Sequence, residues 1–328
     1  MKNICIIGSG SWGVALGIHL AKLGNNIKIW SFMKEEADLI NNEKKCKFLP
    51  GIILPDTIYC TTSYEEAIRD CEIILHVTPS KVVRSSIKEY KKYVTNNQTI
   101  IMCSKGFEKE TLSTLDNVLK EELPNVKLAV LSGPSHAEEV SIGVPTAMVI
   151  ASEDLNLANE IRDLFMNENL RIYTSNDVVG VELGGALKNI IAFCAGVGVS
   201  LGLGDNSFAA LITRGLYEIS ILGEKLGGKK ETFYGLTGLG DLIVTCLSEH
   251  SRNRRAGKLL GQGMKLDDIK KEIGMVIEGV ENIDVAYELS KKCNADTPII
   301  NSVYKVLYED LDAKEAVKML MTRNKKTE

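Results

Sequence analysis

Residues 8–13, Gly8-Ser9-Gly10-Ser11-Trp12-Gly13, decide the fold that we predict for this chain of 328 residues. They follow directly on a short apolar run, Ile4–Ile7, and lead into a segment with helical periodicity. A glycine-rich turn between a strand and a helix opens a βαβ unit of about thirty residues. Gly8 permits the tight turn, Gly10 lets the backbone approach a pyrophosphate, and Gly13 lets the helix pack closely on the strand. We therefore predict a dinucleotide-binding turn, with free N–H groups of the helix N-terminus facing the phosphates.

The first half of the chain alternates short apolar runs with amphipathic stretches. Such alternation indicates parallel strands joined by right-handed helical crossovers, and hence an α/β domain with a doubly wound, Rossmann-like sheet. The expected strands are Ile4–Ile7, Ile27–Trp30, Ile73–Val77, Thr99–Met102, Leu128–Leu131 and Ala147–Ile150. The helices expected between them include Trp12–Leu23, Val82–Tyr90 and Thr111–Leu119.

After about Tyr173 the strand signals almost vanish and long segments with helical periodicity follow one another. This change predicts an all-helical C-terminal domain. Its expected helices are Val178–Val199, Phe208–Leu226, Gly279–Lys291, Ile299–Leu307 and Ala313–Leu320. We expect a dinucleotide-binding domain over residues 1–176 and a helical substrate and catalytic domain over residues 177–328, a division that suits the chain length.

Composition excludes several classes of protein. With 39 Lys and Arg against 43 Asp and Glu, the net charge of −4 offers no electrostatic basis for binding nucleic acid or an anionic membrane. The longest uncharged stretch, Asn189–Gly204, is too short and too rich in glycine to span a bilayer, and we expect it in a buried core helix. No secretory signal is evident, and the eight cysteines are too dispersed for a metal site or a disulfide framework. We expect a cytoplasmic protein without a metal and without membrane insertion.

The residues after the second strand leave the choice of dinucleotide open. An NAD site usually has Asp or Glu at the end of this strand, where the carboxylate binds the ribose 2′-hydroxyl. Here the segment is Trp30-Ser31-Phe32-Met33-Lys34, and only Lys34 is suited to meet a 2′-phosphate. Glu35 and Glu36 follow, but we expect them on the next helix. We therefore expect the protein to accept both NAD and NADP.

Four further segments combine polar groups with small residues, which a plain core does not require. They are Ser104-Lys105-Gly106, residues 132–138, residues 185–190 and residues 238–254. With the glycine turn and residues 276–280 they form the series SGSWG, SKG, GPSHAEE, GALKNI, GLGDLxxTCxSxxSRNR and VIEGV. This series, from residue 8 to residue 280, resembles the bacterial-type NAD(P)-dependent glycerol-3-phosphate dehydrogenases. The resemblance implies interconversion of dihydroxyacetone phosphate and sn-glycerol 3-phosphate for glycerophospholipid synthesis, by a homodimer.

The resemblance also implies a catalytic pair, Lys188 and Asp241. Lys188 matches the family's general base, and it stands in an apolar helical segment where burial disfavours the ammonium form. The alternative is a lysine that extends to solvent from an amphipathic helix. Asp241 matches the acid near that lysine, although it could instead cap a helix that begins at Leu242.

The other site residues are carried over from the same motifs. Arginine is included because its planar fork binds phosphate in a bidentate manner. The implied substrate contacts are Lys105, Gly133, Ser135, Lys188, Asp241, Ser251, Arg252 and Asn253. The implied cofactor contacts are Gly8, Gly10, Ser11, Trp12, Gly13, Lys34, Lys105, Ala137, Arg252, Val276 and Glu278.

Two alternative functions are weighed against this one. A related two-domain reductase would act on another small hydroxy or keto acid. The β-hydroxyacid dehydrogenases have an asparagine four residues after the catalytic lysine, where this chain has Ala192. A dinucleotide-binding redox sensor would keep the glycine turn but would not need a buried lysine, an aspartate and a phosphate-binding cluster.

Overall fold

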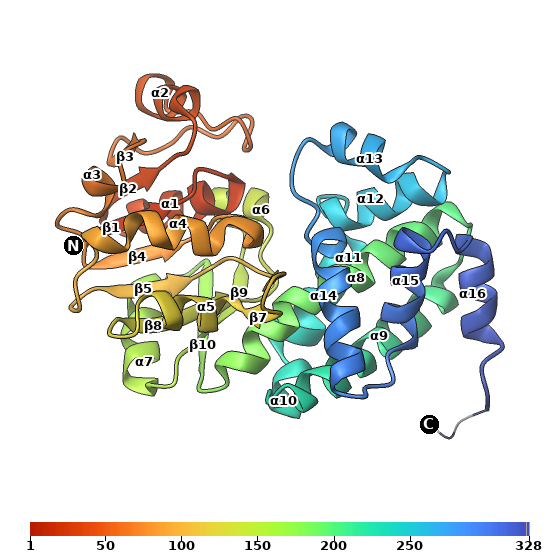
Figure 1. Ribbon diagram of the computed structural model, residues 1–328. Coiled ribbons are helices and arrows are strands. Elements are labelled where there is room, and N and C mark those ends of the chain that lie inside the picture. The colour runs from red at the N-terminus through yellow and green to blue at the C-terminus, as the bar shows by residue number, and fades with distance from the viewer. Residues whose placement is uncertain (326, 328) are drawn as a thin grey trace. The chain divides into compact units, whose positions relative to one another are not determined.

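The computed structural model describes residues 1–325 and residue 327. Two compact units make up the chain: unit 1 comprises Met1–Glu108 and Ser113–Glu182, and unit 2 comprises Lys109–Leu112 and Leu183–Glu328. In Figure 1, unit 1 contains the sheet with its flanking helices, and unit 2 consists of helices. The expected domain division at residues 176 and 177 lies just before helix α8 (Val178–Ser200), and it stays a prediction.

Unit 1 is built on one eight-stranded sheet with the strand order β10-β9-β8-β5-β4-β1-β2-β3. β1 lies inside the sheet between β2 and β4 and pairs with both in parallel. The chain order reverses at β1, so the sheet is doubly wound as predicted. The strands are β1 (Asn3–Ile7), β2 (Asn26–Trp30), β3 (Ile58–Thr61), β4 (Ile73–His76), β5 (Thr99–Met102), β8 (Lys127–Ser132), β9 (Thr146–Ala151) and β10 (Leu170–Ser175).

Sequence periodicity missed the two edge strands, β3 and β10. In β10, Leu170 and Ile172 are buried while Arg171 and Tyr173 are exposed. An edge strand has one face in solvent and therefore alternates polar with apolar residues, whereas the inner parallel strands are continuous apolar runs. The continuous apolar runs could therefore be recognised in the sequence, whereas the short edge strands had too weak a pattern to be predicted.

The expectation that all strands would be parallel was wrong at one position. β9 pairs antiparallel with β8, and β10 then pairs parallel with β9. The connection between β8 and β9 contains only the short helix α6 (Ala137–Ile142). A six-residue helix spans about 9 Å, while a six-residue strand spans about 20 Å. The helix is too short to return the chain to the start of β8, so β9 runs back beside it.

Helices and short turns connect the strands of unit 1. The helices are α1 (Ser11–Lys22), α2 (Lys34–Glu43), α3 (Tyr64–Ile68), α4 (Val83–Tyr90), α5 (Leu115–Glu122), α6 and α7 (Leu155–Phe165). The expected helix Thr111–Leu119 was placed too early, because Ser113–Thr114 forms strand β7, which pairs with β6 (Phe107–Glu108) before α5 begins.

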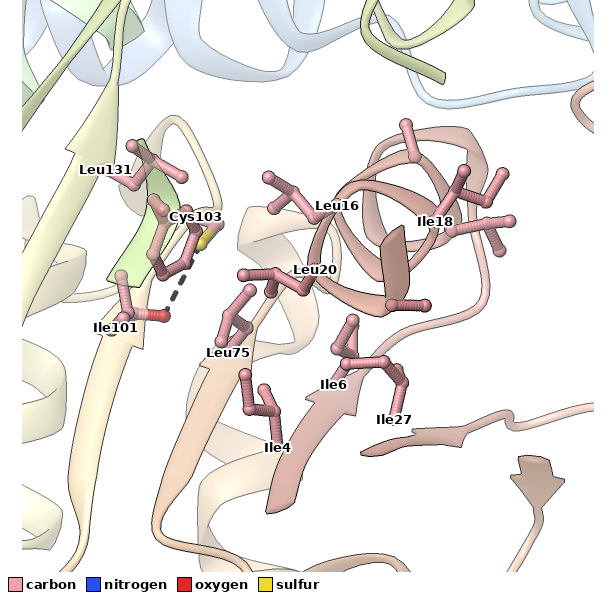
Figure 2. Packing of buried hydrophobic residues seen from close by; sticks show 14 of the residues in the cluster. Ile4, Ile6, Leu16, Ile18, Leu20, Ile27, Leu75, Ile101, Cys103 and Leu131 are labelled. Atoms are coloured by element: carbon pink, nitrogen blue, oxygen red, sulfur yellow. Dashed lines mark hydrogen bonds between the residues drawn. The ribbon is translucent and has the colours of Figure 1, made fainter. Parts of the chain in front are cut away.

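The core of unit 1 holds the glycine turn in place. Figure 2 shows Ile4 and Ile6 of β1 near Leu16 and Leu20 of α1, with Leu75 of β4 beside them. All five side chains are fully buried. Full burial of such a side chain contributes about 1.5–3 kcal/mol. The strand before the turn and the helix after it are therefore fixed by packing on the same core.

Unit 2 is all-helical, as predicted. Besides α8 from Leu183 onward, it contains α9 (Asp205–Lys225), α10 (Lys230–Phe233), a π-helical turn (Leu236–Gly240), α11 (Asp241–Leu247), α12 (Arg252–Gly261), α13 (Leu266–Ile273), α14 (Glu278–Lys292), α15 (Pro298–Tyr308) and α16 (Ala313–Met321). Within the described residues, α8 alone is long and apolar enough to cross a membrane, and 89% of its most apolar stretch is buried inside the protein. That burial is typical of a core helix.

Glycines bring α8 and α12 into backbone contact. A Cβ at Gly196 of α8 would lie 1.9 Å from the carbonyl oxygen of Arg254. A Cβ at Gly257 of α12 would lie 1.9 Å from the carbonyl oxygen of Phe193. Any side chain at these two positions would force the helices apart, so the glycines set the position of the Ser251–Asn253 segment relative to α8.

Candidate active site

The glycine turn has the geometry that the sequence predicts. Gly8 has φ +127°, and a Cβ there would lie 2.9 Å from the Val77 carbonyl oxygen. A Cβ at Gly13 would lie 2.2 Å from the Gly8 carbonyl oxygen. Gly13 is therefore required by the turn itself, and Gly8 by its positive φ and by the segment after β4. At Gly10 a Cβ would meet nothing within 4 Å, so this glycine leaves open space beside the backbone where a pyrophosphate can approach.

The N-terminus of α1 is suited to bind an anion. The helix begins at Ser11 with Gly10 as its N-cap, and no side chain caps it. Its first N–H groups lack helical partners, and the helix dipole favours negative charge at this end. No acidic residue occupies the first turn, while His19 and Lys22 occupy the last. The turn and the helix start together fit the pyrophosphate of a dinucleotide.

Lys34 lies at the first position of α2 and is exposed to solvent. β2 ends at Trp30, and no carboxylate stands at the strand end itself. Phe32, between them, is 81% exposed. The Lys34 side chain is therefore accessible to a 2′-phosphate. Its contact with that group stays a prediction.

Polar residues after β5 and β8 come together in unit 1. Lys105, after β5, donates a hydrogen bond from Nζ to the Gly133 carbonyl oxygen at 3.2 Å. Ser135 Oγ donates to the same oxygen at 3.1 Å. β5 and β8 are parallel neighbours, so their carboxyl ends meet at one edge of the sheet. Gly133 has φ +135°, and Ala137 begins α6 nearby in the chain.

Unit 2 holds a buried ion pair between the two predicted catalytic residues. Lys188 Nζ on α8 donates to Asp241 Oδ1 at 2.5 Å and to Thr245 Oγ1 at 2.7 Å. The Lys188 side chain is 8% exposed and that of Asp241 is 1% exposed. Lys188 does not extend into solvent, so the alternative of a solvated lysine was wrong.

Asp241 does not cap a helix, which was the other interpretation of this residue. α11 begins at Asp241 itself, its N-cap is Gly240, and no side chain makes a capping hydrogen bond. The carboxylate is directed to Lys188 instead. Thr245, one turn further along α11, donates to the Asp241 carbonyl oxygen at 2.6 Å. The hydroxyl therefore has a fixed direction from which it accepts the Lys188 hydrogen bond.

One glycine allows α8 to approach the turn before α11, and a second allows that turn to fold against α10. A Cβ at Gly184 would lie 2.6 Å from the Thr237 carbonyl oxygen, in the π-helical turn that precedes α11. A Cβ at Gly238 would lie 2.0 Å from the Phe233 carbonyl oxygen. The small residues around Lys188 and before Asp241 are thus a condition for the short distance between the two charges.

The surroundings of the ion pair have little solvent. Cys246, next to Thr245, is fully buried. Burial raises the pKa of its thiol to about 12, while the nearby positive charge of Lys188 opposes that rise and Asp241 adds to it. In such surroundings each charge of the pair stabilises the other strongly, and each alone is costly. The burial of Lys188 follows from its apolar segment, and the resemblance implied Asp241 as the acid near it; the structure adds their direct contact.

A second polar network in unit 2 joins α8, α12 and α14. Asn253 Nδ2 donates to Asn189 Oδ1 at 2.8 Å, and Asn189 Nδ2 donates to Glu278 Oε2 at 2.9 Å. The Gly279 N–H donates to Asn253 Oδ1 at 2.8 Å. The network fixes the amide of Asn253 from both sides. It also brings together Asn253 and Glu278, two of the predicted site residues.

The rest of the SRN motif lies at the start of α12. Arg252 donates from its guanidinium to the Val276 carbonyl oxygen at 3.0 Å. Ser251 caps α12, since its hydroxyl accepts from the Arg254 N–H at 3.2 Å. The predicted residues Ser251, Arg252, Asn253, Val276 and Glu278 are therefore neighbours in unit 2.

Sequence reasoning missed two members of these networks, Thr245 and Asn189. Both stood inside the motifs, but neither was given a role. Thr245 is four residues after Asp241, and residues at this spacing share a helix face. That spacing was the available signal for Thr245. The sequence offered no such signal for Asn189, because its partners Asn253 and Glu278 lie on distant helices.

The fold and the two part-sites define a class of protein, a dinucleotide-dependent oxidoreductase with a Rossmann-like sheet and an all-helical second unit. A family model described as NAD-dependent glycerol-3-phosphate dehydrogenase N-terminus matches residues 3–158, and the model of the C-terminus matches residues 177–318. The chain belongs to the NAD-dependent glycerol-3-phosphate dehydrogenase family.

Individual relatives agree with this assignment. The chain is 51% identical to the glycerol-3-phosphate dehydrogenase [NAD(P)+] of Fusobacterium nucleatum, with 100% of this chain and 99% of the relative covered. It is 47% identical to the enzyme of the same name from Agathobacter rectalis, covering 100% and 98%. A crystal structure of glycerol-3-phosphate dehydrogenase from Coxiella burnetii has a TM-score of 0.95 at 37% identity, covering 98% and 99%.

These comparisons confirm the predicted family, the fold class, the class of enzyme and the NAD(P) cofactor. They do not test the roles of single residues, so the assignments for substrate and cofactor contacts stay predictions.

Proposed function

We propose that this protein interconverts dihydroxyacetone phosphate and sn-glycerol 3-phosphate with NAD or NADP. The observation that carries the proposal is the buried contact between Lys188 and Asp241 at 2.5 Å, in a chain of this family. A buried amine held by a carboxylate is suited to proton transfer at a secondary alcohol or a ketone.

Lys188 is the proposed acid and base. In the reductive direction its ammonium donates a proton to the ketone oxygen, and in the oxidative direction its neutral amine accepts the hydroxyl proton. The bound nicotinamide supplies or accepts the hydride. Asp241 and Thr245 hold the Nζ of Lys188 from two sides. The amine therefore meets the substrate oxygen in a fixed position.

The phosphate of the substrate is proposed to bind to cationic and N–H donors. Arg252 and Asn253 stand at the start of α12, whose helix dipole also favours an anion. The Asn253 amide is held by Asn189 and by the Gly279 N–H. Lys105 and the Gly133–Ser135 segment are the proposed substrate contacts in unit 1.

The dinucleotide is proposed to bind on unit 1 with its pyrophosphate at the glycine turn and the N-terminus of α1. The open space at Gly10 and the uncapped helix start support this assignment. The remaining proposed contacts are Ser11, Trp12, Lys34, Lys105, Ala137, Arg252, Val276 and Glu278.

We further propose a cytoplasmic homodimer that supplies sn-glycerol 3-phosphate to glycerophospholipid synthesis, without nucleic-acid or membrane partners. Family membership supports the pathway, and the net charge of −4 supports the absence of nucleic acid.

The decisive experiment follows NADH absorbance with the purified protein and dihydroxyacetone phosphate. Turnover is expected with this substrate, and unphosphorylated dihydroxyacetone should be a very poor substrate because the cationic donors lose their partner. Turnover of a small keto acid but not of dihydroxyacetone phosphate would indicate the related reductase. Dinucleotide binding without turnover of either would indicate the redox sensor.

A further inference from the structure

A carboxylate reaches back from helix α2 to the glycine turn. Glu36 is the third residue of α2, yet its Oε2 accepts a hydrogen bond from Ser9 Oγ at 2.5 Å. Ser31 Oγ lies 3.1 Å from the same oxygen and 2.8 Å from Ser9 Oγ. Ser9 stands between the first two glycines of the turn, and Ser31 directly follows β2. The carboxylate thus ties the turn to the end of the second strand.

The register of the sheet explains why these residues meet. β1 and β2 pair in parallel with Ile7 opposite Trp30, so both strands end at the same level. Ser9, two positions after β1, and Ser31, directly after β2, are both buried. Glu36 comes six positions after the end of β2, and the first turn of α2 returns its side chain to that end. Because Glu36 belongs to the next helix and not to the strand end, the sequence alone does not indicate that it reaches this position.

One oxygen of this carboxylate is available. Within residues 1–325 and 327, Glu36 Oε1 accepts no hydrogen bond, and no lysine or arginine nitrogen lies within 4.0 Å of the carboxylate. Its negative charge acts on its surroundings: burial raises the pKa of Cys60 to about 12, and Glu36 adds to that rise. The side chain is partly exposed, so a ligand can reach it.

In dinucleotide-binding folds the carboxylate that binds the ribose 2′-hydroxyl comes about 20 residues after the glycine motif, beside the second strand. Glu36 stands at about that spacing from Gly13. We propose that Glu36 is this residue, that its Oε1 accepts the ribose 2′-hydroxyl, and that its charge repels a 2′-phosphate. The protein therefore binds NAD(H) more tightly than NADP(H). This inference rests on the proposed function, since it concerns the cofactor of the same reaction.

Lys34 does not cancel this preference. It is exposed at the first position of α2, where solvent and salt screen its charge. Glu36 is held against two buried hydroxyls and is partly shielded from solvent. A fixed, partly buried charge discriminates between ligands more strongly than a mobile, solvated one.

The test measures dissociation constants of NADH and NADPH by fluorescence titration, without turnover. The parent protein should bind NADH more tightly than NADPH. Glu36→Gln should reduce the ratio of the two constants by about tenfold or more, which corresponds to about 1.4 kcal/mol, because the charge that binds the 2′-hydroxyl and repels the 2′-phosphate is removed. Glu35→Gln is the matched control: Glu35 is exposed on the same helical turn, and its loss should leave the ratio unchanged.

Two more measurements complete the test. A dinucleotide lacking the 2′-hydroxyl of the adenosine ribose, 2′-deoxy-NADH, should bind the parent about tenfold more weakly than NADH, and Glu36→Gln should reduce this difference, because an amide oxygen is a weaker acceptor than a carboxylate. In the parent, the ratio of the NADPH and NADH constants should fall as salt is raised, because screening weakens the repulsion. The salt series needs no variant, so it remains decisive if Glu36→Gln does not fold.

The outcomes separate this inference from the proposed function. Equal affinity of the parent for both dinucleotides, a salt-independent ratio, or an equal loss of both affinities in folded Glu36→Gln overturns the role of Glu36 alone. The last result would mean that Glu36 only supports the glycine turn. A folded parent protein that binds neither dinucleotide overturns the proposed function as well.

Discussion

Lys188 Nζ lies 2.5 Å from Asp241 Oδ1, and the pair joins helices α8 and α11 across 53 positions of sequence. Both side chains are almost fully buried. A pair of this kind is electrically neutral as a whole, but removal of one partner leaves an uncompensated charge, at a cost of about 3–5 kcal/mol. The same contact that orients the proposed catalytic amine therefore also contributes to the stability of unit 2, and experiments on it need to separate the two effects.

Lys188→Ala should lower kcat by at least ~10²–10⁴-fold, the usual contribution of positioned proton transfer. NADH affinity should survive, because the glycine turn lies in unit 1. Lys188→Arg should not restore activity: the guanidinium keeps the positive charge opposite Asp241 but does not release its proton near neutral pH. Steady-state kinetics and NADH titration measure both effects, with circular dichroism as the check on folding. Near-parental turnover in a well-folded Lys188→Ala protein would move the base elsewhere, with Lys105 as the next candidate.

Thr245→Val should lower kcat by about tenfold while the KM for dihydroxyacetone phosphate changes little. Valine matches the shape of threonine but removes the hydroxyl that accepts from Lys188 at 2.7 Å, and a hydrogen bond to a charged group is worth ~1.5–3 kcal/mol. Thr245→Ser keeps the hydroxyl and should retain most of the turnover. Equal losses in the two variants would assign Thr245 a packing role only.

Arg252→Ala should raise the KM for dihydroxyacetone phosphate by about 10–100-fold, because a bound phosphate would lose a charge-assisted partner. Arg255→Ala provides the control on the same helix. Arg255 is half exposed and pairs with Glu272 at the surface, and such pairs contribute little. Initial-rate kinetics at saturating NADH distinguish the variants. A similar KM in both would remove the phosphate assignment from Arg252.

Gly13→Ala and Gly10→Ala should fail in different ways. The Gly13 Cβ would lie 2.2 Å from the Gly8 carbonyl oxygen, so this variant should lose about 1–3 kcal/mol of stability through overpacking. The Gly10 Cβ meets nothing within 4 Å, so Gly10→Ala should keep the parental Tm but bind NADH weakly, since the methyl group occupies the space beside the backbone. Thermal unfolding and NADH titration of both variants test this difference. Parental NADH affinity in Gly10→Ala would place the pyrophosphate elsewhere.

Glu218 should make the stability of the protein depend on pH. Burial raises the pKa of its carboxyl to about 8, against the opposing effect of the N–H groups of Ile299 and Ile300, which donate to it. Since the ordinary value is 4.5, the folded state binds the proton more tightly than the unfolded state does. This contribution to the free energy of unfolding is fully present below the ordinary pKa and is lost as the pH rises through about 8.

Denaturant unfolding of the parent and of Glu218→Gln across this pH range tests the assignment. The variant loses an acceptor for one of the two N–H groups, so it should be less stable at acid pH. Its stability should nevertheless fall less steeply between pH 4.5 and about 8. Identical slopes in the two proteins would show that another group titrates in this range.

Local patterns were sufficient to predict much of unit 1. Gly13 is required by a contact within the turn and Gly8 by its positive φ, and the inner strands are apolar because both of their faces are covered. The antiparallel β9 was missed because its direction follows from the length of α6 relative to β8. Strand periodicity carries no information on direction.

The catalytic and cofactor contacts depend on positions far apart in the chain. The resemblance named Lys188 and Asp241, but their distance of 2.5 Å follows from the close approach of α8 to the π-helical turn at Gly184 and Gly238. The contact of Glu36 with Ser9 likewise follows from the level ends of β1 and β2. Periodicity and turn chemistry act over a few residues, because they reflect backbone geometry. Which side chains meet is set by the packing of whole helices and strands, and a buried charge is stable only where that packing brings its partner.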